Sequence, residues 1–149
     1  MNGVDDVASG PSGIETLRAL ISAGGHTPIG GTLDFLLTEV GDGWARLTAT
    51  PSLKVYNPIG TVHGGYAATL LDSVCGCAVQ SKLSASQIYT TLELKVGYLR
   101  PITADTGLLR AEGRVQQVGR RAAFAEADIK DRTGRILATA TSTLLVMER

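Results

Sequence analysis

Hydrophobic residues recur along this chain with two different periods. Between residues 14 and 21 they fall three or four positions apart, which predicts a short amphipathic helix that Gly24-Gly25 ends. Over 32–38 and 44–50 apolar and polar residues alternate instead, and Gly41-Asp42-Gly43 between these runs is typical of a turn. The first third of the chain is therefore predicted to form a helix and a β-hairpin.

A long stretch without proline, from Gly65 to about Lys82, is apolar on nearly every face and predicts a helix inside the protein. Gly119-Arg120 and residues 131–134 are the predicted hairpin turns of the region that follows. The strand-like runs there are 90–99, 107–118, 121–130 and 135–147. This order predicts an α+β fold in which one largely antiparallel sheet curls around the central helix.

Composition bounds the domain organisation and the partners. The chain has 149 residues, 44% of them hydrophobic, which is enough apolar material for one core. Residues 1–12 have little to bury, so we expect a flexible tail there and a single domain over 13–149. Fourteen basic residues balance fourteen acidic ones, so no broad field favours nucleic acid or an anionic membrane.

Other segments argue against membrane insertion, secretion and a metal centre. No run reaches the roughly 18 apolar residues of a membrane span, and the N-terminus has acids where a signal peptide has lysines. We therefore expect a cytoplasmic protein. Cys75 and Cys77 point in different directions on a helix, and His26 and His63 are the only histidines, so no metal site is expected.

A glycine-rich turn, His63-Gly64-Gly65, leads directly into the central helix. Unpaired N–H groups and the positive end of the helix dipole meet there, which favours negative charge. Without Cβ atoms at Gly64 and Gly65, a carbonyl oxygen can approach these N–H groups as it becomes an oxyanion. The alternative is a tight loop-to-helix turn without chemistry.

Asp72 lies in the middle of the same helix among apolar residues. Burying a carboxylate costs several kcal/mol unless it is paired or hydrogen-bonded, so Asp72 is a candidate general base or nucleophile. The alternative is a carboxylate bonded to Ser73 or to nearby backbone. Gly64 and Asp72 are eight residues apart, roughly 12 Å along a helix, so one copy cannot bring both to one carbon atom. Two antiparallel copies of the helix across a two-fold axis can, which predicts at least a dimer.

Several polar residues are candidates for supporting roles. Asn57 can orient a water or a carbonyl, or can simply form a turn. His63 can contact the substrate or hold the turn. Arg100, Arg120 and Arg121 can bind the phosphates of a nucleotide, or can remain solvated on the surface.

The spacing of these residues resembles that of the hotdog-fold thioesterases, particularly the phenylacetyl-CoA and 4-hydroxybenzoyl-CoA type, over roughly residues 30–147. The resemblance rests on Asn57, Gly60, His63-Gly64-Gly65, Leu71-Asp72 and Tyr98-Leu99-Arg100-Pro101. It implies an antiparallel sheet wrapped around a long helix, and an acyl-CoA substrate with no metal or bound cofactor. It also implies a homodimer or a dimer of dimers with active sites at the subunit interface.

The resemblance also implies roles for individual residues. Asp72 would activate water or attack the acyl carbon, with Thr91 positioning the water, while the Gly64 and Gly65 amides polarise the carbonyl. Asn57 and His63 would come from the same subunit as the glycines, and Asp72 from its partner. Coenzyme A would lie near Gly119, Arg120 and Arg121. Some relatives have a hydroxyl residue one turn after a catalytic glutamate; Gly76 stands there in this chain, which favours the aspartate-using branch.

The expected activity is hydrolysis of aromatic or medium-chain acyl-CoAs to the free acid and coenzyme A. The acyl pocket is expected to be lined by Tyr66, Leu70 and Val74. Two alternatives stay open: a hydratase or dehydratase acting on acyl thioesters, and a non-catalytic protein that binds acyl-CoA.

Overall fold

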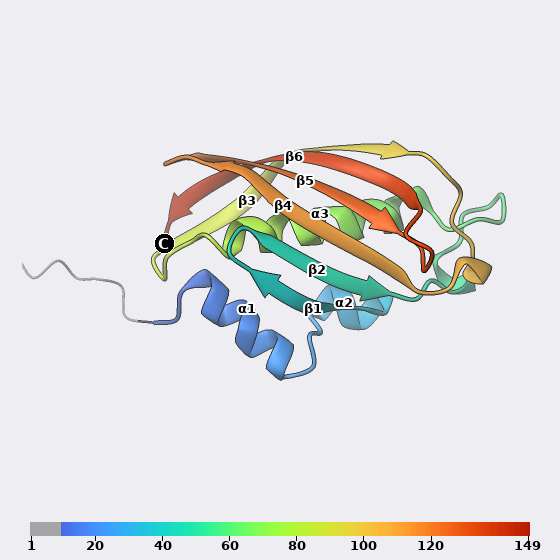
Figure 1. The fold of residues 1–149 in the computed structure, drawn as a ribbon, viewed down its shortest axis with the longest axis horizontal. Coiled ribbons are helices and arrows are strands. Elements are labelled where there is room, and N and C mark those ends of the chain that lie inside the picture. Colours follow the sequence, from blue (N-terminus) through green and yellow to red (C-terminus); the bar gives the residue numbers. More distant parts are fainter. Residues whose placement is uncertain (1–9) are drawn as a thin grey trace, which may run out of the picture.

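A computed structural model describes residues 10–149, which form one antiparallel sheet with a long helix against it (Figure 1). The helices are α1 (Gly13–Ser22), α2 (Pro28–Leu33) and α3 (Gly64–Gln80). The strands are β1 (Phe35–Gly41), β2 (Trp44–Ala49), β3 (Gln87–Tyr98), β4 (Leu109–Val118), β5 (Ala122–Lys130) and β6 (Ile136–Glu148). Short 3-10 turns lie at Leu53–Val55 and Ala104–Thr106.

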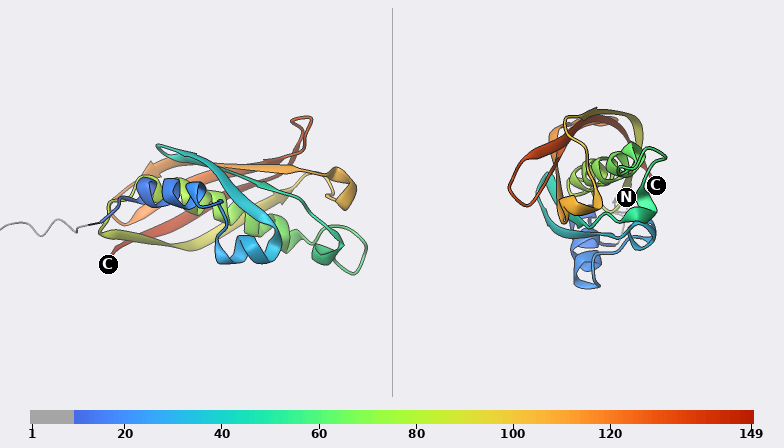
Figure 2. Two further views of the ribbon diagram at one scale, coloured as in Figure 1. Left: turned by 90° about the horizontal axis from the view of Figure 1, so that it is seen from below. Right: turned by 90° about the vertical axis from the view of Figure 1, so that its right-hand side faces the viewer.

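The six strands follow the order β1-β2-β4-β5-β6-β3, and every neighbouring pair is antiparallel. Figure 2 shows, in the view along the long axis, that the sheet curls around α3. The predicted architecture is thus confirmed, including the two hairpin turns that join β4, β5 and β6.

The helix α3 packs closely on the inner face of the sheet. Leu70, Leu71 and Val74 are fully buried, and a Cβ atom at Gly113 of β4 would lie only 2.4 Å from the Val74 carbonyl oxygen. A glycine is therefore required where the strand backbone meets the helix backbone. The prediction of a helix inside the protein is thus confirmed, and in the single chain one stripe of α3 that includes Asp72 is only partly buried.

The N-terminal helices combine a confirmed prediction with a wrong one. Helix α1 ends just before Gly24 and Gly25, which have positive φ angles, as predicted. The strand expected from residue 32 begins only at Phe35, because residues 28–33 form α2. The Thr27 side chain caps α2 by accepting the Gly30 N–H at 3.1 Å, and this start signal outweighs the alternation of the following residues.

The tail predicted for residues 1–12 lies mostly outside the described residues, which begin at residue 10. Of its last residues, Ser12 caps α1 by accepting the Glu15 N–H. The division into a tail and one domain stays a prediction. Within residues 10–149, none of the helices has the length and apolar character needed to cross a membrane.

Candidate active site

The turn before α3 is held by hydrogen bonds on both sides. The Val62 N–H donates to the Ile102 carbonyl and the His63 N–H to the Val55 carbonyl, each at 2.8 Å. The His63 ring then caps the helix, because its Nδ1 atom accepts the Gly65 N–H at 2.8 Å. A neutral imidazole that accepts at Nδ1 carries its proton on Nε2, so exposed His63 presents a free N–H donor to solvent.

Gly64 and Gly65 therefore differ in what their N–H groups can do. The Gly65 N–H is occupied by His63, whereas the Gly64 N–H has no hydrogen-bond partner within residues 10–149. The Tyr98 hydroxyl donates to the Gly64 carbonyl oxygen at 2.6 Å. Of the two predicted oxyanion donors, the Gly64 N–H is thus the unpaired one among the residues that the structure describes.

A hollow of about 440 Å³ opens at this end of α3. Its walls include both glycines of the turn, Thr61, Tyr98 and Arg100. No carboxylate of the described residues lines it, and the free Gly64 N–H and the Arg100 guanidinium both favour an anionic oxygen there. Tyr98, which was not among the predicted site residues, joins β3 to the helix start.

Asn57 forms the loop before the hollow. Its Oδ1 atom accepts the N–H groups of Ile59 and Thr61, each at 3.1 Å, and its Nδ2 donates to the Thr61 hydroxyl at 2.9 Å. These bonds form an Asx-type turn, which is the structural alternative considered for Asn57. A role in orienting water stays a prediction.

Asp72 lies two turns further along α3, half-buried on its open stripe. The Thr91 hydroxyl of β3 donates to Asp72 Oδ1 at 2.9 Å. Ser73 is not its partner, because the Ser73 hydroxyl donates to the Thr69 carbonyl at 2.7 Å. The structure thus joins two predicted site residues that lie 19 positions apart in sequence.

A β-bulge explains how Thr91 reaches Asp72. The register between β3 and β6 shifts between Thr91 and Glu93, so the alternation of inward and outward side chains changes phase at Leu92. Thr91 then faces α3, and so do Leu94 and Val96, while Leu92 is 59% exposed. If inward and outward side chains alternated along β3 without a bulge, with Leu92 and Tyr98 facing inward, Thr91 would face away from α3.

The remaining nucleophilic or titratable groups near Asp72 are held in their neutral forms. Burial, with a smaller contribution from Asp72, raises the pKa of the Cys75 and Cys77 thiols to about 12. Burial also raises the pKa of Tyr89, whose hydroxyl lies where a Cβ atom at residue 76 would be. Gly76 therefore makes room for Tyr89, and neither thiol is an activated nucleophile.

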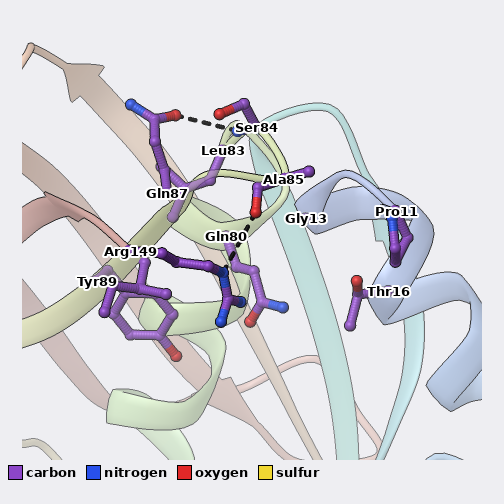
Figure 3. A pocket seen from close by; sticks show the side chains of 11 residues that line it. Pro11, Gly13, Thr16, Gln80, Leu83, Ser84, Ala85, Gln87, Tyr89 and Arg149 are labelled. Atoms are coloured by element: carbon purple, nitrogen blue, oxygen red, sulfur yellow. Dashed lines mark hydrogen bonds between the residues drawn. The ribbon is translucent and has the colours of Figure 1, made fainter. Parts of the chain in front are cut away.

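A second hollow, of about 310 Å³, lies at the C-terminal end of α3 (Figure 3). Gln80, Gln87 and Tyr89 line it, and the Gln87 side chain accepts the Ser84 N–H at 3.0 Å. Among the described residues, its walls include the Arg149 side chain but no acidic or histidine side chain. Tyr89 connects it to the neighbourhood of Gly76, one turn from Asp72.

The predicted coenzyme A residues are divided between the two ends of the molecule. Arg100 lines the hollow at the start of α3. Gly119 closes the β4–β5 turn by donating to the Ala122 carbonyl at 2.8 Å, and Arg120 and Arg121 line a depression beside the end of β6. Figure 1 shows this turn at the opposite end of the sheet from the start of α3. One chain therefore does not bring these two arginines to Gly64.

Metal ligands are not gathered in the part of the chain that the structure describes, since no three histidine, cysteine or acidic side chains come together there. The polar groups that the structure presents instead are the Asp72 carboxylate with its donor, the Thr91 hydroxyl, and the unpaired Gly64 N–H at the start of the helix.

Comparisons with known proteins point in one direction. The model of the Thioesterase superfamily matches residues 59–138, more than half of the chain. A Halobacterium salinarum protein named as an esterase is 37% identical over 107 residues, covering 66% of this chain and 69% of the relative. The 1,4-dihydroxy-2-naphthoyl-CoA hydrolase of Escherichia coli is 26% identical over 132 residues, covering 89% of this chain and 95% of the relative.

A solved structure from Ralstonia eutropha, named as a thioesterase related to phenylacetic acid degradation, superposes with a TM-score of 0.77 at 28% identity. The superposition covers 87% of this chain and 98% of that one. The segment matched by the superfamily model contains the turn before α3, all of α3 and β3.

Proposed function

Because this chain belongs to the Thioesterase superfamily and is a thioester hydrolase, we propose that it cleaves aromatic or medium-chain acyl-CoAs to the free acid and coenzyme A. The sheet wrapped around α3 is the hotdog fold expected from the resemblance. The observation that supports the proposal most is the pairing of a half-buried Asp72 with a hydroxyl donor, on the same helix that begins with a free amide.

The proposed chemistry uses these groups in order. As general base, Asp72 removes a proton from a water while the water oxygen attacks the thioester carbonyl carbon. The carbonyl oxygen becomes an oxyanion, which the Gly64 N–H and the His63 Nε2–H stabilise. Collapse of this intermediate breaks the carbon–sulfur bond, and the leaving thiolate takes the proton from Asp72. The same carboxylate can instead attack the carbon directly, to form an anhydride that water then hydrolyses.

The separation of Asp72 from Gly64 is the reason to propose that two copies build each site. Their distance along α3 is roughly 12 Å, too far for one thioester. The open stripe of α3 carries small residues such as Ala68, Thr69 and Ser73, which let a second helix approach closely. Within residues 10–149, β3 is also a sheet edge that pairs with β6 on one side, and it exposes Leu92 and Tyr98. We propose that Asp72 of one copy faces Gly64 of the other.

The substrate class is proposed from the relatives together with the surface of this chain. One relative is named for an aromatic acyl-CoA, and Arg100 beside the helix start can contact the coenzyme A moiety. Arg120, Arg121 and Gly119 can reach that end only from a second copy. Tyr66, Leu70 and Val74, expected to line the acyl pocket, are buried in the core of the single chain instead.

Release of free coenzyme A from a panel of aromatic and aliphatic acyl-CoAs tests this proposal. We expect thiol release with the acid as the second product. Loss of an enoyl absorbance with the thioester intact would identify a hydratase, and tight acyl-CoA binding without turnover would identify a binding protein. Either result would overturn the proposal.

Thr91→Val should lower kcat roughly tenfold with little change in KM. A hydrogen bond to a charged group contributes about 1.5 kcal/mol or more, and the valine removes the hydroxyl while keeping the shape. Steady-state kinetics would check this, with Thr91→Ser expected to retain most of the rate. Thr90→Val is the matched control, because Thr90 is exposed on the adjacent position of β3. Equal losses in Thr91→Val and Thr90→Val would contradict a specific role.

A further inference from the structure

A third hollow, of about 450 Å³, opens beside the one at the start of α3. The two share Arg100 and Pro101 in their walls, so they are neighbouring parts of one surface. Its other walls come largely from the β5–β6 turn and include Arg132, Thr133 and Arg135. We call this hollow the arginine groove.

The arginine groove carries a local positive charge in a chain of zero net charge. Its three arginines face one lining carboxylate, Asp131, and within residues 10–149 none of the three forms a salt bridge. Asp131 Oδ1 is used inside the turn, where it accepts the Thr133 hydroxyl and N–H at 2.6 and 2.9 Å. The arginines are therefore available to an external anion.

Two of these guanidinium groups, those of Arg100 and Arg132, lie against the backbone along the groove. Arg100 Nη1 donates to the Ile136 carbonyl at 2.6 Å, which fixes its plane while leaving other N–H groups free. The Arg132 guanidinium lies over Gly107, where a Cβ atom would be 3.1 Å from its Nη2 atom. Gly107 has a φ of 74°, a conformation that glycine adopts readily, and its lack of a side chain leaves room for the Arg132 guanidinium.

We propose that Arg132 and Arg135, with Arg100, bind the phosphates of the nucleotide end of the acyl-CoA in the arginine groove. This inference rests on the proposed function. Guanidinium groups bind phosphate oxygens in paired hydrogen bonds, and coenzyme A carries a pyrophosphate and a further ribose phosphate. The groove adjoins the hollow that contains Gly64, so a substrate with its thioester at Gly64 can place its pantetheine arm along that hollow and its nucleotide end in the groove.

This assignment differs from the one predicted from sequence, in which Arg120 and Arg121 bind coenzyme A. Those arginines lie at the far end of the sheet in the same chain. Arg132 and Arg135 need no second copy, since they share a surface with Gly64 of their own chain.

The test compares two substrates with two double variants. One substrate is the acyl-CoA that the protein hydrolyses fastest, and the other is the same acyl group on pantetheine, which has no nucleotide. For Arg132→Gln/Arg135→Gln we expect KM for the acyl-CoA to rise at least about tenfold, the loss of at least one charged contact, with kcat unchanged. The kinetics with acyl-pantetheine should not change. Arg18→Gln/Arg110→Gln removes the same charge from exposed positions outside the groove and should behave as wild type.

Adenosine 3′,5′-bisphosphate gives an independent readout, because it should inhibit the wild type competitively and the Arg132/Arg135 variant at least about tenfold more weakly. Equal KM increases for acyl-CoA and acyl-pantetheine in Arg132→Gln/Arg135→Gln would overturn the assignment of the nucleotide to the arginine groove. It would also be overturned if Arg120→Gln/Arg121→Gln, and not Arg132→Gln/Arg135→Gln, raised KM for the acyl-CoA alone. The proposed function fails separately, if the wild type hydrolyses neither substrate.

Discussion

Asp72→Asn should lower kcat for coenzyme A release at least about a hundredfold, the usual size of a general-base effect. The amide has the shape of the carboxylate and can still accept the Thr91 hydroxyl through its oxygen, so the fold should be retained. It cannot remove a proton from water or attack a carbonyl carbon. The loss is therefore expected in kcat, with substrate binding nearly unchanged.

Single-turnover and steady-state assays of purified Asp72→Asn would measure this, with circular dichroism to verify folding. Ser73→Ala is the matched control, because the Ser73 hydroxyl donates to the Thr69 carbonyl of its own helix and not to Asp72. We expect this control to keep nearly the full rate. Wild-type turnover by Asp72→Asn would remove Asp72 from the mechanism.

Gly64→Pro should cost about a hundredfold in kcat, because it deletes the one free amide proposed to stabilise the oxyanion. Gly64 is the first residue of α3, a position that proline accepts in helices. His63 before it has φ −59° and ψ 133°, which is compatible with a following proline. The substitution thus removes an N–H donor while preserving the helix start.

Gly64→Ala separates the effect of losing the N–H donor from the effect of adding a Cβ atom. Both variants place a Cβ atom near the Tyr98 hydroxyl, 3.1 Å away, but alanine keeps the N–H group. We expect the alanine variant to stay within a few-fold of wild type, a loss set by small movements of the half-exposed Tyr98. If alanine and proline cost the same, the space at Gly64 matters and its amide does not.

The sequence predicted those parts of the fold that depend on local periodicity. The helix from residue 65, the last three strands and their turns all have strong hydrophobic patterns, and the structure confirms them. Helix α2 was missed because a Thr27-Pro28 start signal precedes only six helical residues, which also read as alternation. Short segments carry too few residues for their period to be decisive.

The side-chain contacts of the candidate site were harder to predict from the sequence than the fold. Asp72 and the glycine turn could be selected from their chemistry, whereas the contact between Thr91 and Asp72 depends on a bulge at Leu92 that no alternation pattern shows. The occupation of the Gly65 N–H by His63 depends on one side-chain rotamer. Arg132 and Arg135 read as ordinary turn residues, and only the folded chain places them beside Arg100.

Mixed dimers test most directly whether Asp72 of one copy works with Gly64 of another. Asp72→Asn and Gly64→Pro chains, with different affinity tags, would be refolded together, and sedimentation would check for particles of at least twice the 15.6 kDa chain mass. In a mixed dimer one site then carries both substitutions and the other carries none. A random mixture should therefore recover about a quarter of the wild-type specific activity, although each variant alone is nearly inactive. Absence of recovery in verified mixed dimers would contradict the shared site, because each site would then contain one defect.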